Sequence, residues 1–354
     1  MPARARRIGV LTFHRCINYG SYWQARCLVE GLRKMGHDAE LLDHQSAEIR
    51  RAEWRCAFQP SLPERTARKD FPHYAAKARA VLHAVEALPR SHRFALDRPQ
   101  ESGARDCVVV GSDEVWNLSH PWYGGVPIFY GAGLETDRLM SYAASFGNYD
   151  ADAGLHPAWA ERLGRFDAIS VRDENSRRLV EDALGRTPAF VLDPVLQFPP
   201  PAEAVADDGP YVALYGHSFP EWFRRAVRAW ANERGLPLVS IGYRNHWADA
   251  HRIEAGPIEF GRLIAGAAAV VTNFFHGCVF ALLNVKPFAC TASAYRANKL
   301  RDLTAALGAE RHLVREDARE RIADALDQPL APEIGRRTAM LRAQSSAYLR
   351  AALA

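Results

Sequence analysis

The segment Ile8–Asp43, IGVLTFHRCINYGSYWQARCLVEGLRKMGHDAELLD, has the pattern of a strand, a loop, a helix and a second strand. Residues 8–13 form a short, partly β-branched apolar run, which is typical of a buried strand. Apolar residues recur every three or four positions over 22–35, which predicts a helix with Ser21 as its N-cap and Gly36 just beyond its end. A second strand at the end of the segment completes a unit that is typical of parallel α/β sheets.

The order of strand, loop and helix recurs through the first half of the chain. Short apolar runs end in polar or glycine-bearing loops at 107–110, 139–143 and 168–171. Such runs are typical of an open parallel sheet, whose ligands bind at the carboxyl ends of the strands. The Arg- and Ala-rich stretch 47–99 has helical periodicity, and we expect it to cover one face of the sheet, with a surface stretch at 59–70.

A change of composition divides the chain. Residues 198–210 contain PPP and DDGP, which are typical of a linker, and strand–helix alternation resumes beyond them. The predicted parts are an N-terminal Rossmann-like domain on the acceptor side (1–197), the linker (198–210), a C-terminal Rossmann-like domain on the donor side (211–330) and a C-terminal helix (331–354). The expected fold class is therefore α/β, with two Rossmann-like domains and their parallel sheets in a GT-B-like arrangement. A cleft between two domains is the first place to expect a site.

Length and charge exclude several function classes. The chain has 354 residues, 48% of them hydrophobic, and 45 basic against 41 acidic residues, as in an ordinary globular protein. The basic residues are dispersed, so we do not expect a nucleic acid partner. The apolar run near the N-terminus is shorter than that of a signal peptide, and no window approaches the roughly 18 apolar residues of a membrane span. We therefore expect a cytoplasmic protein whose cysteines are reduced core residues.

Four loops lie where a strand gives way to a helix, a position at which free backbone N–H groups favour anions. These loops contain Asn18, Gly20 and Ser21, then Gly111, Ser112 and Asp113, then Arg172, and finally His276 and Gly277. Glycine is also the usual residue of a tight turn, so no single loop is specific. The chain lacks both GxxxxGK[ST] and GxGxxG, which gives an ATPase or a dinucleotide enzyme little support.

The cationic candidates have two interpretations each. Arg172 could bind a phosphate or carboxylate, or it could form an ion pair with Asp173 or Glu174. His276 lies between apolar residues and could be a core histidine, a phosphate ligand or a proton carrier.

The candidates after the strand at 107–110 also have alternatives. Asp113 could be the base that deprotonates a sugar hydroxyl, or it could be an N-cap. Trp116 and Asn117 could form a platform for a sugar ring, although tryptophan more often packs in a core.

The loops belong to a longer ordered set of motifs. In chain order they are IGVLTF (8–13), NYGS (18–21), VGSDEVWN (110–117), SYAASFG (141–147), SVRDENS (170–176), LDP (192–194), GPIEF (256–260), VTNFFHG (271–277) and KPF (286–288). The set resembles the polysaccharide pyruvyl transferase family from about Ile8 to Ala309. Members of that family are GT-B-like and transfer the enolpyruvyl group of phosphoenolpyruvate onto sugar hydroxyls, which forms a pyruvate ketal.

The resemblance implies a role for each candidate. Its catalytic residues would be Asp113 and His276; its donor-binding residues would be Arg172, His276, Gly277, Asn18, Gly20 and Ser21; and its acceptor-binding residues would be Ser112, Asp113, Trp116 and Asn117. Phosphoenolpyruvate would be a co-substrate, with no metal or other cofactor. The acceptor would be a bacterial surface glycan or exopolysaccharide, or its lipid-linked precursor, which allows an association with assembly machinery at the inner face of the membrane.

Two positions depart from the family's pattern. Phe274 stands where members commonly have Ser or Arg, and Glu114 stands where Gln is common. Two other functions therefore stay open: a GT-B glycosyltransferase that uses a nucleotide sugar, and a non-catalytic glycan-binding paralogue.

Overall fold

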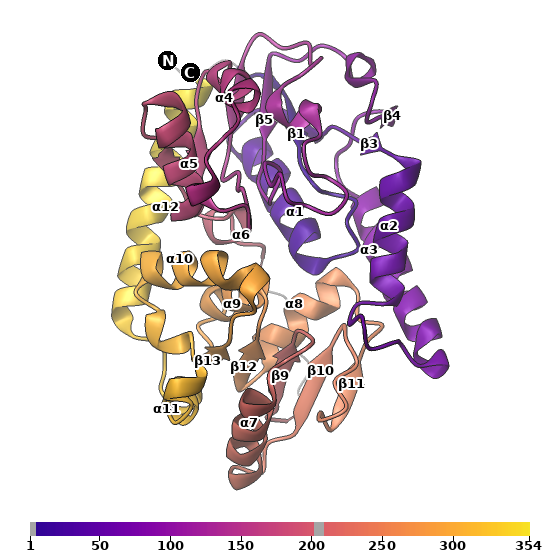
Figure 1. Cartoon of the computed structure of the whole chain (residues 1–354), viewed down its shortest axis with the longest axis vertical. Coiled ribbons are helices and arrows are strands. Elements are labelled where there is room, and N and C mark those ends of the chain that lie inside the picture. The colour runs from indigo at the N-terminus through magenta and orange to yellow at the C-terminus, as the bar shows by residue number, and fades with distance from the viewer. Residues whose placement is uncertain (1–4, 202–208) are drawn as a thin grey trace.

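The computed structural model describes residues 5–201 and 209–354, and its two parallel sheets occupy the upper and lower halves of Figure 1. The upper sheet has the order β2-β1-β5-β6, with bounds Asp38–Leu41, Arg7–Leu11, Cys107–Val110 and Leu139–Ser141. Bridges from Met140 to Ala168 and from Ala144 to Val171 continue it to β7 (Ser170–Val171), which pairs with β8 (Ala189–Phe190). Two short strands, β3 (His44–Gln45) and β4 (Phe94–Ala95), pair beside it.

The lower sheet has the order β11-β10-β9-β12-β13, and each of its pairs is also parallel. Its strands are Ala250–Arg252, Leu238–Ile241, Val212–Tyr215, Ala269–Thr272 and Phe288–Cys290. Two parallel sheets with helices between their strands confirm the predicted α/β class and its GT-B-like pair of Rossmann-like halves. Of the predicted linker 198–210, residues 202–208 lie outside the described residues.

The helices of the upper half are α1 (Tyr19–Lys34), α2 (Ala47–Phe58), α3 (Phe71–Glu86), α4 (Pro157–Gly164), α5 (Glu174–Leu184) and α6 (Pro194–Gln197). Those that follow are α7 (Glu221–Glu233), α8 (Pro257–Gly266), α9 (Phe275–Leu283), α10 (Ala297–Leu307), α11 (Arg321–Asp327) and α12 (Pro332–Leu353). In Figure 1, α12 runs along one side of the molecule from beside α10 to the top of the upper half. It returns the chain to the upper half, where Ser345 Oγ accepts from the Leu192 amide at 2.9 Å and Tyr348 donates to the Ser141 carbonyl at 2.7 Å.

Helix α1 begins three residues earlier than its apolar periodicity predicts. Its N-cap is Asn18, whose side chain accepts from the Gly20 amide at 2.7 Å, so the prediction of Ser21 as the cap is wrong. Ser21 instead lies in the first turn. The predicted end is confirmed, because Met35 caps the helix and Gly36 follows with a φ of +94°, a conformation that glycine adopts readily.

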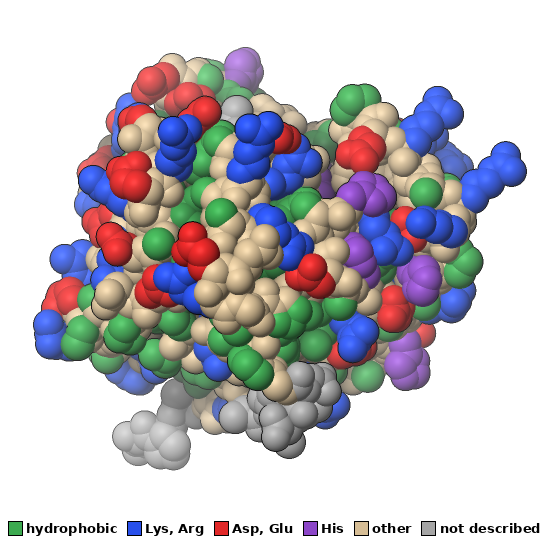
Figure 2. Space-filling view, turned by 90° about the horizontal axis from the view of Figure 1, so that it is seen from below, with side chains coloured by type: hydrophobic (Ala, Val, Ile, Leu, Met, Phe, Trp, Pro, Cys, Tyr) green, Lys and Arg blue, Asp and Glu red, His purple; other side chains and the backbone are tan. Residues whose placement is uncertain are grey.

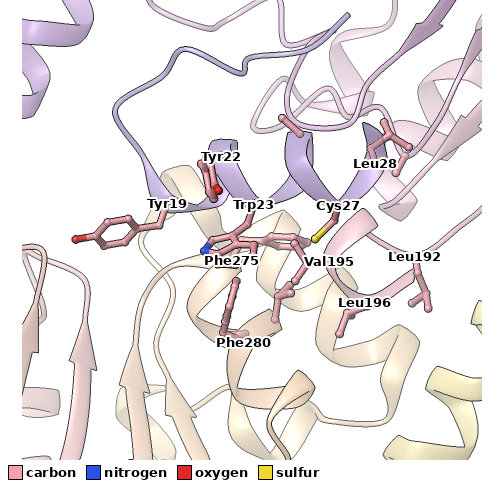
Figure 3. Close-up of a cluster of buried hydrophobic side chains, with 14 of the residues drawn as sticks. Tyr19, Tyr22, Trp23, Cys27, Leu28, Leu192, Val195, Leu196, Phe275 and Phe280 are labelled. Atoms are coloured by element: carbon pink, nitrogen blue, oxygen red, sulfur yellow. The ribbon is translucent and has the colours of Figure 1, made fainter. Parts of the chain in front are cut away.

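Helix α1 also joins the two halves of the molecule. Figure 3 shows its side chains Trp23 and Cys27 beside Phe275 and Phe280 of α9, whereas Tyr19 points away from them and stacks on Phe260 of α8. The Trp23 ring meets Phe280 edge-on at 5.5 Å, and the Tyr19 hydroxyl donates to the Ala255 carbonyl at 2.6 Å. One hydrophobic cluster therefore extends from the upper sheet into the lower half, and it fixes the start of α1 against the start of α9.

Five of the six cysteines are buried and all six are reduced, but Cys56 is exposed, so its prediction as a core residue is wrong. On the face drawn in Figure 2, basic and acidic side chains are interspersed, as the dispersed sequence charges predict. Within residues 5–201 and 209–354, no helix has both the length and the apolar character that crossing a membrane requires.

Candidate active site

A cavity of about 330 Å³ lies where loops from the two halves meet. Its lining includes residues that directly follow the carboxyl ends of β1, β5 and β7 in one half and of β9, β10 and β12 in the other. This is the position at which parallel sheets bind ligands. Among the predicted site residues, the lining contains Asn18, Ser21, Asp113, Arg172 and His276.

Arg172 is the centre of a buried ion-pair network in this cavity. Its guanidinium donates to Asp193 Oδ2 at 2.8 Å and to Asp113 Oδ1 at 3.4 Å. These partners replace the predicted ones, because Asp173 caps α5 by accepting from the Ser176 amide at 2.8 Å. Burial opposes the charge on Arg172, but the nearby carboxylates raise its pKa above the ordinary value.

Asp193 connects this network to the other half of the molecule. Its Oδ2 atom lies 3.6 Å from His276 Nε2, which has no hydrogen-bond partner among the described residues. Burial would raise the pKa of Asp193, but His276 and Arg172 together lower it below its usual range. The carboxylate therefore lies between two groups that can carry a positive charge.

Asp113 has an unusual backbone conformation and a carboxylate that lines the cavity. Its φ is +77°, and its Oδ2 accepts a hydrogen bond from Ser21 at 2.9 Å. The preceding Gly111 has a φ of +113°, and a Cβ there would lie 2.4 Å from the Tyr142 carbonyl oxygen, which no side chain tolerates. Non-glycine residues at positive φ are uncommon and cluster at functional sites.

His276 packs directly on the first turn of α1. A Cβ at Gly20 would lie 2.1 Å from His276 Nδ1, so only glycine allows this approach. The Gly20 amide is bonded to Asn18, and it is therefore not free to bind an anion. Gly20 and Ser21 of α1 thus lie beside His276 and Asp113, respectively, which come from opposite halves.

Five predicted site residues do not line the cavity: Gly20, described above, and Ser112, Trp116, Asn117 and Gly277. Trp116 is fully buried, packs on Phe166 and donates to the Phe129 carbonyl at 2.8 Å, so the predicted sugar platform is wrong. Ser112 is buried and donates to Gln24 at 3.0 Å.

The amide groups of Asn117 and Gly277 are likewise hydrogen-bonded within the protein. The Asn117 amide donates to Glu114 and to Asn148 at 2.8 Å each, and the Gly277 amide donates to the Phe274 carbonyl at 3.0 Å. A Cβ at Gly277 would lie 2.1 Å from Thr272 Oγ1, so this glycine is required for packing and is not a free anion donor. The predictions that Ser112, Asn117 and Gly277 contact a substrate are therefore wrong in this structure.

The structure also places in the cavity charged residues to which the sequence analysis gave no site role. Glu114 forms an ion pair with Lys299, and it accepts from Tyr295 at 3.3 Å. Burial would raise the pKa of Glu114, but Lys299 lowers it to about 2. This pair connects the loop after β5 to α10.

Lys77 of α3 is a second such residue. Its side chain is buried, its ammonium donates to the Gly242 carbonyl at 2.9 Å, and burial lowers its pKa to about 7. The sequence pattern could have identified Lys77, because its helical spacing from Tyr74, Val81 and Val85 places it on the buried face of its helix. A lysine on an apolar stripe is uncommon unless it has a partner or a function.

The comparisons with known proteins agree with the order of the motifs. Residues 18–295 match the family model described as polysaccharide pyruvyl transferase. A search of curated proteins finds no matching sequence.

Solved structures give distant matches to the whole chain. MnaA of S. aureus in complex with UDP is 12% identical over 90% of this chain and 86% of its own, with a TM-score of 0.47. The UDP-GlcNAc 2-epimerase of Neisseria meningitidis is 11% identical over 96% and 98%, with a TM-score of 0.47. The glycosyltransferase SnogD of Streptomyces nogalater is 14% identical over 97% and 95%, with a TM-score of 0.40. These scores are low, and the likeness carries no information about substrates.

Proposed function

The chain belongs to the polysaccharide pyruvyl transferase family and is a transferase, and from this we propose that it moves the enolpyruvyl group of phosphoenolpyruvate onto two hydroxyls of a sugar. The product is a pyruvate ketal on a bacterial surface glycan, an exopolysaccharide or its lipid-linked precursor. The observation that supports this proposal most directly is that Asp113, Arg172 and His276 line one cavity, with buried Asp193 in contact with Arg172 and His276.

The proposed reaction requires one proton to be added and two to be removed. Protonation of the methylene carbon of phosphoenolpyruvate produces an oxocarbenium-like centre at the carbon that bears the phosphate. One sugar hydroxyl adds to this carbon and loses its proton, inorganic phosphate leaves, and the second hydroxyl adds and loses its proton. No electrons are gained or lost, so the reaction needs no redox cofactor.

The residues of the network have suitable chemistry for these steps. We assign the removal of a hydroxyl proton to Asp113, which is held by Ser21 and Arg172 and lines the cavity. We assign His276 to proton transfer, because its Nε2 atom has no hydrogen-bond partner among the described residues and lies 3.6 Å from the Asp193 carboxylate. Arg172 keeps both carboxylates in place.

The test is calorimetric titration of the purified protein with phosphoenolpyruvate, UDP-glucose and GDP-mannose, followed by measurement of phosphate release with candidate glycan acceptors. We expect binding of phosphoenolpyruvate only, and transfer that shows as a gain of the pyruvate ketal mass on the acceptor. Asp113→Asn should retain donor binding and lose at least a hundredfold in rate. Binding of a nucleotide sugar alone would contradict the proposal in favour of glycosyl transfer.

A further inference from the structure

The charge around Arg172 is already compensated inside the protein. Its guanidinium is paired with Asp193 and Asp113, and buried Asp173 lies beside it in sequence. Phosphoenolpyruvate carries a carboxylate and a phosphate, so a site made only of this network would place carboxylates next to a multiply charged anion. Like charges at such distances in a partly dry cavity are strongly unfavourable.

Two other cations in the cavity have no acidic partner. Lys77 and Arg296 both line it, and within the described residues neither has a carboxylate within 4.0 Å. Lys77 is only 5% exposed, and among the described residues the Arg296 side chain donates one hydrogen bond, to Ser293 Oγ at 3.3 Å. Buried charges in folded proteins are normally paired, because removal from water without a counter-charge is costly.

Aromatic rings hold these two cations in the same part of the cavity. The Lys77 ammonium lies 4.0 Å from the centre of the Tyr243 ring, and the Arg296 guanidinium lies 4.4 Å from that of Phe274. The two rings meet edge-on at 5.4 Å. His217 lines the same cavity, with its ring 5.1 Å from that of Tyr243 and 5.3 Å from that of Phe274. Burial and the charges of Arg296 and Lys77 lower the pKa of this imidazole to about 3.

The two cations also come from opposite halves of the fold. Lys77 belongs to α3, whereas Arg296 directly precedes α10 in the other half. The Lys77 ammonium donates to Gly242, which follows β10, so the two halves meet at this point. The pair is assembled by the same closure that brings His276 to α1.

We propose that Lys77 and Arg296 form the anion subsite of this cavity and bind a small phosphate-bearing ligand, which in the proposed reaction is the phosphate of phosphoenolpyruvate. The identification of that donor rests on the proposed function, whereas the binding of inorganic phosphate does not. In this arrangement the two unpaired cations neutralise the phosphate. The network of Asp113, Arg172, Asp193 and His276 then serves proton transfer.

The experiment is calorimetric titration of the whole protein with inorganic phosphate and, separately, with phosphoenolpyruvate. Lys77→Met and Arg296→Met keep the stems that pack on the rings and remove only the charges. Each substitution should weaken the affinity for both ligands by about tenfold to a hundredfold, which is the contribution of a hydrogen bond between charged groups. The matched control is Arg79→Met, an exposed cation on the same helix as Lys77, and it should bind both ligands as the unaltered protein does.

The outcomes separate the subsite from the function. If the unaltered protein binds phosphate but not phosphoenolpyruvate, and both variants lose the binding of phosphate, the proposed subsite is supported and the proposed function is contradicted. If the unaltered protein binds phosphoenolpyruvate and both variants bind both ligands equally well, the subsite is overturned and the function stands. Arg296 is partly exposed, so we expect Arg296→Met to fold. If Lys77→Met does not fold, phosphate binding by Arg296→Met alone tests the subsite.

Discussion

Replacement of Gly20 by alanine is expected to displace His276 and to remove most of the activity while the chain stays folded. The added Cβ would lie 2.1 Å from His276 Nδ1 and 2.6 Å from its Cγ, whereas ordinary contacts begin at 3.4 Å. The imidazole must therefore move by about 1 Å or more, and a misplacement of this size costs about a hundredfold in rate. Overpacking costs about 1–3 kcal/mol, and the helical preference of alanine over glycine offsets about 1 kcal/mol of it.

The assay compares the initial rate of phosphate release from phosphoenolpyruvate with the free energy of unfolding in urea. Gly335→Ala in α12 is the matched control, because a Cβ there meets no atom within 4 Å. This control should keep its full rate and gain about 1 kcal/mol in stability. Full activity of Gly20→Ala with unchanged stability would refute the reasoning, since it would mean that the position of His276 does not matter.

Three further predictions concern the surroundings of the cavity. Lys299→Met leaves Glu114 buried without its cation and should cost about 3–5 kcal/mol at pH 7. The pKa of Glu114 is lower in the folded protein than in the unfolded chain, so the stability from this pair is present above about pH 4.5 and is lost toward pH 2. Urea unfolding at pH 7 and at pH 3 should therefore show a smaller stability difference between Lys299→Met and the unaltered protein at the lower pH. Trp116→Phe should lower the free energy of unfolding but leave the KM for the glycan acceptor unchanged. A raised KM would show that Trp116 contacts the sugar after all. Dialysis against EDTA should leave kcat unchanged, whereas a loss that added Mg²⁺ reverses would show that the cations of the cavity are not sufficient.

Local patterns of the sequence were enough to predict the strands and the loops that follow them. Apolar runs such as 107–110 form buried parallel strands because both faces of the sheet are covered, and the residues after each run must then gather at one edge. Asp113 and Arg172 line one cavity for this reason, and His276, which follows β12 of the other sheet, lines the same cavity from the opposite half. The start of α1 was missed because its first turn packs against the other half of the molecule, so Tyr19 and Gly20 do not follow the periodicity of a helix on a single sheet.

The neighbours of each candidate could not be predicted, because they come from distant parts of the chain. Trp116 follows the motif that contains Asp113, yet its ring points into a core formed with Tyr130, Phe146 and Phe166, and sequence proximity to a site does not reveal this. Lys77 shows the opposite case, since it lies in a helix whose composition is that of a simple covering element. It reaches the cavity only because α3 packs beside Gly242 and Tyr243, more than 160 residues later in the chain. The order of the sequence motifs therefore did not reveal this site, whereas the charges in the structure do. A buried cation with no carboxylate beside it indicates a place where the fold can bind an anion.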